Sequence, residues 1–183
     1  RTPDSLRQAL CEWSLQQYRW PIEPGWQLWL PGVVPALHLA SLALTEPGDG
    51  VLTVTPIYPP FLKVAERTGR LAQTARLAEP VSAGEGWRLD REALEAAITP
   101  ETRLLLWCHP HNPTGRVWHH EELAIIADLA ERHDLIVVEN DAMADFKLNS
   151  ATKLSGLDQL GRTLYLGSFS KPISAALRVG FIA

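Results

Sequence analysis

The sequence predicts an α/β fold, a three-layer sandwich around a mostly parallel sheet of about seven strands. Apolar runs with the composition of strands alternate along the chain with segments whose apolar residues recur at helical spacing. Two runs, LLLW at 104–107 and LIVV at 135–138, are apolar throughout, which is typical of strands buried on both faces. The sequence shows no internal repeat, low-complexity tract or linker, so we expect one domain over residues 1–183.

The predicted strands are short apolar runs, and turn-forming or polar residues follow most of them. In chain order they span Gln27–Leu30, Gly50–Thr55, Leu71–Leu77, Arg103–Cys108, Leu135–Glu139, Thr163–Gly167 and Val179–Ala183. Because helix-type segments separate most of these runs, we expect most neighbouring strands to be parallel.

Four predicted helices lie between the strands, each with apolar residues at helical spacing. They span Pro35–Leu44, Pro59–Thr68, Asp90–Ile98 and His119–His133. In the last of these, we expect one face to pack against the sheet, because its apolar residues recur at helical spacing. They are Leu123, Ile126, Ala127 and Ala130.

The composition excludes several classes of protein. Of the 183 residues, 46% are hydrophobic and 21% are charged, which excludes disorder, collagen and coiled coil. The net charge is −4 and the basic residues are scattered, so the chain lacks the positive surface that direct nucleic-acid binding requires. Cys11 and Cys108 are far apart and form no disulfide framework, which favours a reducing compartment and a cytoplasmic location.

One uncharged stretch, Pro24–Thr45, is long enough to raise the question of a membrane helix. Pro31, Gly32 and Pro35 interrupt it, and a strand, a turn and a helix explain the same residues. We therefore expect no membrane association.

Residues with chemical function follow five of the predicted strands. In an open α/β sheet, ligands bind beyond the carboxyl ends of the strands, so these positions form the expected site. They are the turn Pro31–Ala36, Tyr58, Asn112, Asn140 with Asp141, and Ser168–Lys171 with Arg178 seven residues later. Each feature alone is explained by a turn, a core contact or a solvated side chain. Together they match the needs of an aldehyde cofactor with an aromatic ring and a phosphate.

Five motifs occur in the order PGVVPAL, TPIYPPF, HPHNPTGRVW, ENDAMADF and SFSKPISAALRVGF. This order resembles the fold type I pyridoxal-phosphate (PLP) enzymes of the class I/II aminotransferase superfamily. The resemblance covers nearly the whole chain, and NPTG combined with SxSK and a following arginine is highly specific. From Leu6 to about Val138, the chain is most similar to cystathionine β-lyase-like C–S lyases. The last part resembles aminoadipate-type aminotransferases and the effector domain of MocR-type regulators.

The resemblance implies that pyridoxal 5'-phosphate is the cofactor and that Lys171 is the catalytic, Schiff-base lysine. Such an amine must be partly deprotonated to attack an aldehyde, and desolvation or a nearby cation favours the neutral form. The phosphate would be held by a helix N-terminus, two hydroxyl groups and a guanidinium group, which come from Gly32, Val33, Val34, Ser168, Ser170 and Arg178.

The resemblance also assigns residues to the pyridine ring. Tyr58 would stack on the ring, and Asn112 would donate to its 3-hydroxyl oxygen. Family members place an Asp beneath the ring nitrogen and a Tyr three residues later, whereas this sequence has Asn140 and Met143 there. An amide stabilises a pyridinium less than a carboxylate does, so the electron sink would be weaker. Asp141 takes the role only if the strand end shifts by one residue, and the alternation of side chains favours Asn140.

A metal site is an alternative for one cluster. Cys108, His109 and His111 contain the atoms that bind metals, but their alternating positions at a strand end and the NPTG context favour a site without metal.

Family members are longer, with an N-terminal arm and a C-terminal small domain, and their active site is usually completed across a homodimer. We therefore expect residues 1–183 to be the PLP-binding large domain of a longer protein that forms homodimers and acts on an amino acid. Three functions remain open. They are an enzyme that performs transamination or β-elimination C–S lysis, a PLP-binding sensor domain of a MocR-type regulator, and a catalytically incompetent fragment.

Overall fold

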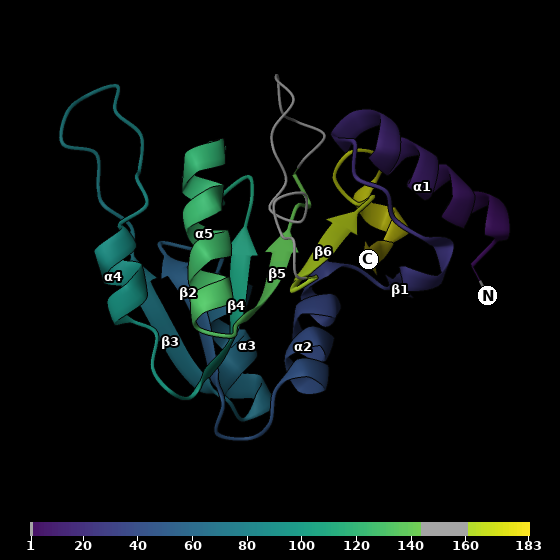
Figure 1. Ribbon diagram of the computed structural model, residues 1–183. Helices are drawn as coiled ribbons and strands as arrows, with labels where there is room; N and C mark the ends of the chain where they lie inside the picture. Colours follow the sequence, from purple (N-terminus) through teal and green to yellow (C-terminus); the bar gives the residue numbers. More distant parts are fainter. Residues whose placement is uncertain (1, 144–160) are drawn as a thin grey trace.

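Within the described residues, 2–143 and 161–183, the computed structural model has one seven-stranded sheet with helices on both faces (Figure 1). The strands are β1 (Leu28–Leu30), β2 (Gly50–Thr55), β3 (Leu71–Arg76), β4 (Thr102–Cys108), β5 (Ile136–Asn140), β6 (Thr163–Ser168) and β7 (Gly180–Ile182). Their order across the sheet is β1-β7-β6-β5-β4-β2-β3. Strand β7 is antiparallel to its neighbours β1 and β6, and the other pairs are parallel. The predicted fold class is therefore confirmed, and each strand end differs from its prediction by a single residue at most.

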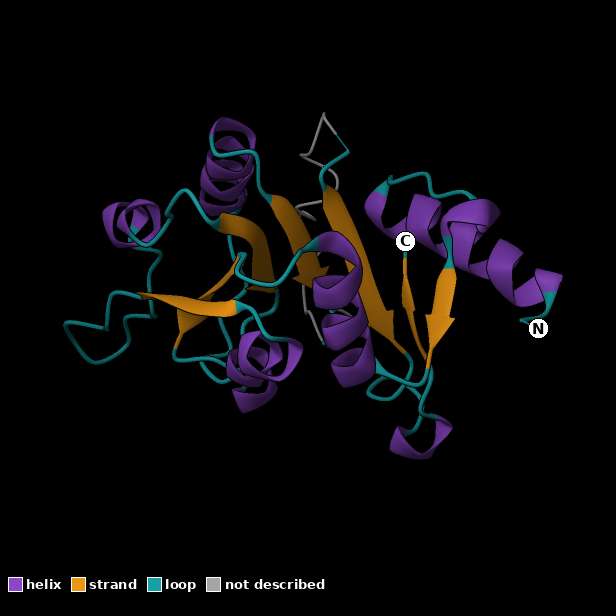
Figure 2. Ribbon diagram, turned by 90° about the horizontal axis from the view of Figure 1, so that it is seen from below, coloured by secondary structure: helices purple, strands orange, loops and turns teal. Residues whose placement is uncertain are grey.

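The helices form the two outer layers of the sandwich (Figure 2). On one face lie α2 (Val33–Leu44) and α3 (Pro59–Thr68), and on the other lie α1 (Asp4–Tyr18), α4 (Arg91–Ala96) and α5 (His120–Arg132). Two short 3-10 helices are η1 (Pro24–Trp26) and η3 (Ala175–Leu177). None of the helices in the described ranges has the length and apolar character needed to cross a bilayer.

Helix α1 was not among the predicted helices. Leu10 of this helix is buried in a cluster with Tyr165 of β6 and Phe181 of β7, and Trp13 packs against the same cluster. Leu6, Leu10 and Trp13 recur at helical spacing, so the apolar pattern alone could have identified the helix.

The central strands are buried on both faces, as their apolar runs predict. Leu105 and Trp107 of β4 belong to the core beneath α4 and α5, whereas Leu104 and Leu106 belong to the core beneath α2 and α3. The edge strand β3 is mostly exposed, because no strand lies beyond it.

The direction of the strands explains why the candidate site residues lie at one edge of the sheet. β1, β2, β4, β5 and β6 all end at the same edge of the sheet. Because β7 runs the opposite way, its beginning lies at that edge, and Arg178 precedes β7 by two residues. Lys171 and Arg178 therefore lie at the same edge, in the connection between β6 and β7.

Two glycines bring β7 against the start of α2. A Cβ atom on Gly180 would lie 3.2 Å from the carbonyl oxygen of Gly167 and 3.2 Å from backbone atoms of Gly32. Gly32 has a φ of 113°, a conformation that residues with side chains rarely adopt. Because these glycines have no side chains, their backbones pack directly against each other and hold the N-terminus of α2 beside the end of β6.

Helix α2 begins at Val33, two residues before the predicted start at Pro35. Gly32 is the N-cap, so Val33, Val34 and Pro35 are the first three helical positions. Proline fits there because the N–H groups of the first turn have no partner within a helix. The correction places the amides of Val33 and Val34 inside the helix, at its positive end.

The turn after β4 is held by buried polar contacts. His111 donates its backbone N–H to the Arg116 carbonyl at 2.7 Å, and its Nδ1 lies 2.8 Å from the Thr114 hydroxyl. The indole N–H of Trp118 donates to the Cys108 carbonyl at 3.0 Å. Burial lowers the pKa of His111 from 6.5 to about 4, since the interior disfavours the charged imidazolium. The side chain is therefore neutral at physiological pH.

We expect Gly180→Ala to lower the free energy of unfolding by about 1–3 kcal/mol, because the new methyl group meets backbone atoms on two sides that cannot rotate away. Gly25→Ala is the matched control, because a Cβ atom there has no neighbour within 4 Å. Urea unfolding of both variants measures the difference. Equal midpoints would show that β7 and α2 are not closely packed.

We expect stability to fall as the pH drops from about 6.5 towards 4. In this window the unfolded chain protonates His111, whereas the folded protein, with its depressed pKa, does not. The loss attributable to this residue is on the order of 3 kcal/mol at the acid end. Urea unfolding at pH 7, 6 and 5 should show a smaller loss in His111→Gln. An identical pH slope in that variant would contradict the assignment.

Candidate functional site

A cavity of about 220 Å³ opens at the carboxyl edge of the sheet, and every residue predicted to hold the cofactor lines it. These residues are Gly32, Val33, Val34, Tyr58, Asn112, Asn140, Met143, Ser168, Ser170, Lys171 and Arg178. They come from the ends of β1, β2, β4, β5 and β6 and from the segment before β7. The structure thus brings together residues that lie far apart in the sequence.

One end of the cavity has the features of an anion site. The α2 N-terminus offers the N–H groups of Val33 and Val34, which have no acceptor within the helix. The Arg178 guanidinium approaches Gly32, so that a Cβ atom there would lie 3.7 Å from its terminal nitrogen. Glycine at this position leaves the space between helix and guanidinium open.

The SFSK turn is ordered by its first serine. The Ser168 hydroxyl donates to the Val179 carbonyl at 3.3 Å and accepts the Ser170 N–H at 3.1 Å. These bonds shape the backbone that presents Ser170 and Lys171 to the cavity. Lys171 and Arg178 are both exposed at its rim.

A backbone hydrogen bond joins Tyr58 to Asn112 of the NPTG motif. The Tyr58 N–H donates to the Asn112 carbonyl at 2.9 Å, which links the ends of β2 and β4. Tyr58 is 39% exposed and lines the cavity. A planar ligand can stack there.

Asn140 is the last residue of β5 and is almost fully buried. Its Oδ1 accepts the Ala142 N–H at 3.2 Å, and its Nδ2 lies 3.9 Å from Cys108 Sγ. Met143, three residues later in the sequence, also lines the cavity.

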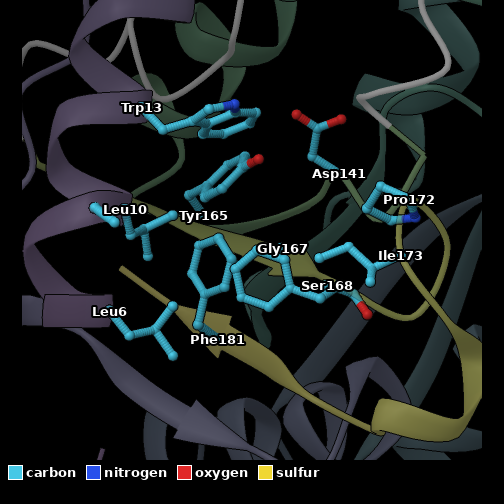
Figure 3. Close-up of a pocket in the computed structure, with 12 residues that line it drawn as sticks. Leu6, Leu10, Trp13, Asp141, Tyr165, Gly167, Ser168, Pro172, Ile173 and Phe181 are labelled. Carbon is cyan, nitrogen blue, oxygen red and sulfur yellow. The ribbon is translucent and has the colours of Figure 1, made fainter. Parts of the chain in front are cut away.

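Asp141 does not line this cavity. It faces a second cavity of about 370 Å³, together with Leu10, Trp13 and Tyr165 (Figure 3). This placement matches the register preferred from the sequence, in which successive side chains at the end of β5 point to opposite faces. The rest of the ENDAMADF motif, from residue 144 on, lies outside the described residues.

The alternative metal site gains no support from the geometry. Nδ1 of His109 lies 3.3 Å from the Trp118 N–H, and Nδ1 of His111 lies beside the Thr114 hydroxyl. Within the described part of the chain, no three His, Cys, Asp or Glu side chains lie close enough to hold a metal ion.

Some lining residues were not predicted. Cys108, Pro110, Ala142 and Ala175 also line the cavity. Cys108 was not predicted to line the cavity, although its position at the end of a buried strand, four residues before Asn112, indicates that it lies near the site.

The charged side chains among the described lining residues of this cavity all have the same sign. Among the described lining residues, Lys171 and Arg178 are cationic and none is acidic. Two cations and a helix N-terminus select an anionic ligand, and the neutral amides and tyrosine ring accommodate a flat polar body.

Comparisons with known proteins agree with this geometry. The family model for aminotransferases of class I and II matches residues 1–183. Cystathionine β-lyase PatB of Bacillus subtilis strain 168 is 36% identical over 149 residues, which are 80% of this chain and 38% of PatB. YisV of the same strain, described as an uncharacterised HTH-type transcriptional regulator, is 29% identical over 187 residues, covering 97% of this chain and 36% of YisV.

A solved structure shows the same fold. Cystalysin from Treponema denticola, whose crystal structure contains a pyridoxal 5'-phosphate cofactor, superposes with a TM-score of 0.91 at 28% identity. The match covers 100% of this chain and 47% of cystalysin, so the chain spans less than half the length of each of these three proteins. On the family match across its whole length, the chain belongs to the aminotransferase class I and II family.

Proposed function

We propose that residues 1–183 are the PLP-binding large domain of an enzyme that acts on amino acids by transamination or by β-elimination of the C–S lyase type. The main support for this proposal is that one cavity contains Lys171 and the anion site formed by the N-terminus of α2 and Arg178. The Tyr58 ring and the side-chain amides of Asn112 and Asn140 line the same cavity. Similarity to a cystathionine β-lyase and to PLP-containing cystalysin supports it.

The residues present fit the cofactor. The phosphate would lie between the N-terminus of α2 and Arg178, in the space that Gly32 leaves open. Ser170 would add a hydroxyl donor, and Ser168 would hold the turn in shape. The pyridine ring would lie against Tyr58, with Asn112 and Asn140 at its polar edges.

When bound, PLP supplies an aldehyde that condenses with amines and a ring that withdraws electrons from the substrate. Lys171 is the one lysine among the described lining residues, so it would hold the cofactor and then move the proton of the substrate Cα. Arg178 would remain on the phosphate and contribute positive charge near Lys171.

We propose the protein's assembly and location on separate grounds. Both cysteines are free thiols, which favours a reducing compartment, the cytoplasm. The cavity is open, with Lys171, Arg178 and Tyr58 exposed, and a homodimer would cover this rim with a second copy.

A second candidate function is a sensor domain that binds PLP and an amino ligand with little turnover. Two observations favour it. Asn140 stands where a carboxylate would strengthen electron withdrawal, and YisV, a regulator by its description, matches 97% of the chain. Cα-hydrogen exchange of bound amino acids separates the two functions, because an enzyme exchanges rapidly and a sensor does not.

We expect borohydride reduction of the PLP-loaded protein to attach the cofactor to Lys171, since this amine is at the cavity and is next to the anion site. Peptide mapping by mass spectrometry identifies the labelled lysine. Lys171→Ala should lose the label, whereas Lys63→Ala, on the exposed side of α3, should keep it. Labelling at Lys63 in the unaltered protein would refute the assignment.

We expect Tyr58→Ala to weaken PLP binding by roughly threefold to tenfold, because stacking contributes about 0.5–1.5 kcal/mol beyond area burial. Tyr58→Phe should bind nearly as well as the unaltered protein, since it retains the ring. Leu62→Ala, an exposed position on α3, is the matched control. Absorbance titration gives the dissociation constants, and an unchanged value for Tyr58→Ala would exclude stacking.

A further inference from the structure

The orientation of the Asn140 amide follows from its backbone partner. The Ala142 N–H, 3.2 Å away, can only donate, so the oxygen of the amide must face it. The NH₂ group therefore points the other way, towards Cys108 Sγ at 3.9 Å and the cavity. Because an NH₂ group has two hydrogens, one remains for a ligand.

Cys108 ties this amide to the rest of the site. Its thiol is 3% exposed and donates to the Pro110 carbonyl at 3.2 Å. The sulfur also receives the Asn140 contact and a backbone hydrogen bond from Asn112. Burial raises the pKa of the thiol to about 11, so it is neutral at physiological pH. One uncharged side chain thus contacts the ends of β4 and β5 and the NPTG turn.

Among the described lining residues, no carboxylate near Asn140 could pair with a protonated ring nitrogen. The charged residues among the described lining are Lys171 and Arg178, both cationic. Asp141, the neighbouring carboxylate in the sequence, faces the second cavity (Figure 3). A pyridinium N–H is a donor and would meet another donor here, whereas an unprotonated pyridine nitrogen is an acceptor and would be matched.

We infer that Cys108 is a positioning residue, which holds the Asn140 NH₂ group towards the cavity so that the site binds the pyridine ring through an unprotonated nitrogen. This inference rests on the proposed function. An unprotonated ring withdraws electrons less strongly than a pyridinium does, so it would stabilise a carbanion at the substrate Cα less.

Nitrogen NMR of the protein loaded with PLP that is ¹⁵N-labelled in the ring tests the protonation state directly. We expect the shift of a neutral pyridine in the unaltered protein and the shift of a pyridinium in Asn140→Asp, because a carboxylate at contact distance stabilises the charged ring. A pyridinium shift in the unaltered protein would overturn the inference and leave the proposed function intact. Failure to bind PLP at all would overturn both.

A second measurement isolates the role of Cys108. The probe is a PLP analogue in which C–H replaces the ring nitrogen. We expect the unaltered protein to bind PLP about twofold to tenfold more tightly than this analogue, the range for one hydrogen bond. Cys108→Ala should lose this preference, because a methyl group offers no acceptor to the Asn140 NH₂ group.

Cys11→Ala is the matched control, since Cys11 lies on α1 and does not line the cavity. It should keep the full preference for PLP. The preference is a ratio of two affinities, so a general loss of folding or binding does not change it. An unchanged ratio in Cys108→Ala would overturn the positioning role.

Discussion

The reversal of β7 between β1 and β6 is the constraint on which the site depends. It requires the backbone of β7 at Gly180 to lie so close to the backbone at Gly32, before α2, that a side chain on Gly180 would not fit without a shift. This contact sets the N-terminus of α2 beside the end of β6 and leaves room for Arg178. The N-terminus of α2 and the turn that contains Lys171 come from segments more than 130 residues apart in the sequence, and this one packing contact joins them.

The two ends of the cavity differ in their electrostatics. The end near α2 is positive, with a helix N-terminus and a guanidinium group, and suits a phosphate. The end near β5 contains a thiol and an amide, both neutral, with no acidic side chain among the described lining residues. In the proposed function, the site would therefore favour a phosphate at one end and stabilise positive charge on the ring only weakly at the other, so cofactor binding does not by itself imply catalysis.

Buried polar residues gather at the carboxyl ends of β4 and β5. His109, His111, Asn140 and Asp141 are all nearly inaccessible, and polar side chains cost free energy when they are removed from water. Part of this cost is offset by local hydrogen bonds, such as those of His111 with Thr114 and of Asn140 with Ala142. The concentration of such residues at one edge fits a site that must order a ligand, since the core elsewhere in the two large clusters is apolar.

The sequence by itself determined the alternation of strands and helices, because apolar runs such as LLLW and LIVV can only be covered by layers on both faces. It also determined which residue types occupy the strand ends, from Gly32 to Arg178. The prediction missed α1, although Leu6, Leu10 and Trp13 recur there at helical spacing. It also began α2 two residues late, because a proline at position 35 is compatible both with a turn and with the first turn of a helix. Tertiary structure alone decided that β7 runs antiparallel, that Asp141 faces a second cavity with Trp13 and Tyr165, and that Cys108 contacts the Asn140 side chain and the Asn112 backbone. The physical reason is that local patterns specify the period of side chains along a strand, whereas the contacts between strand ends depend on the order and direction in which the whole sheet is assembled.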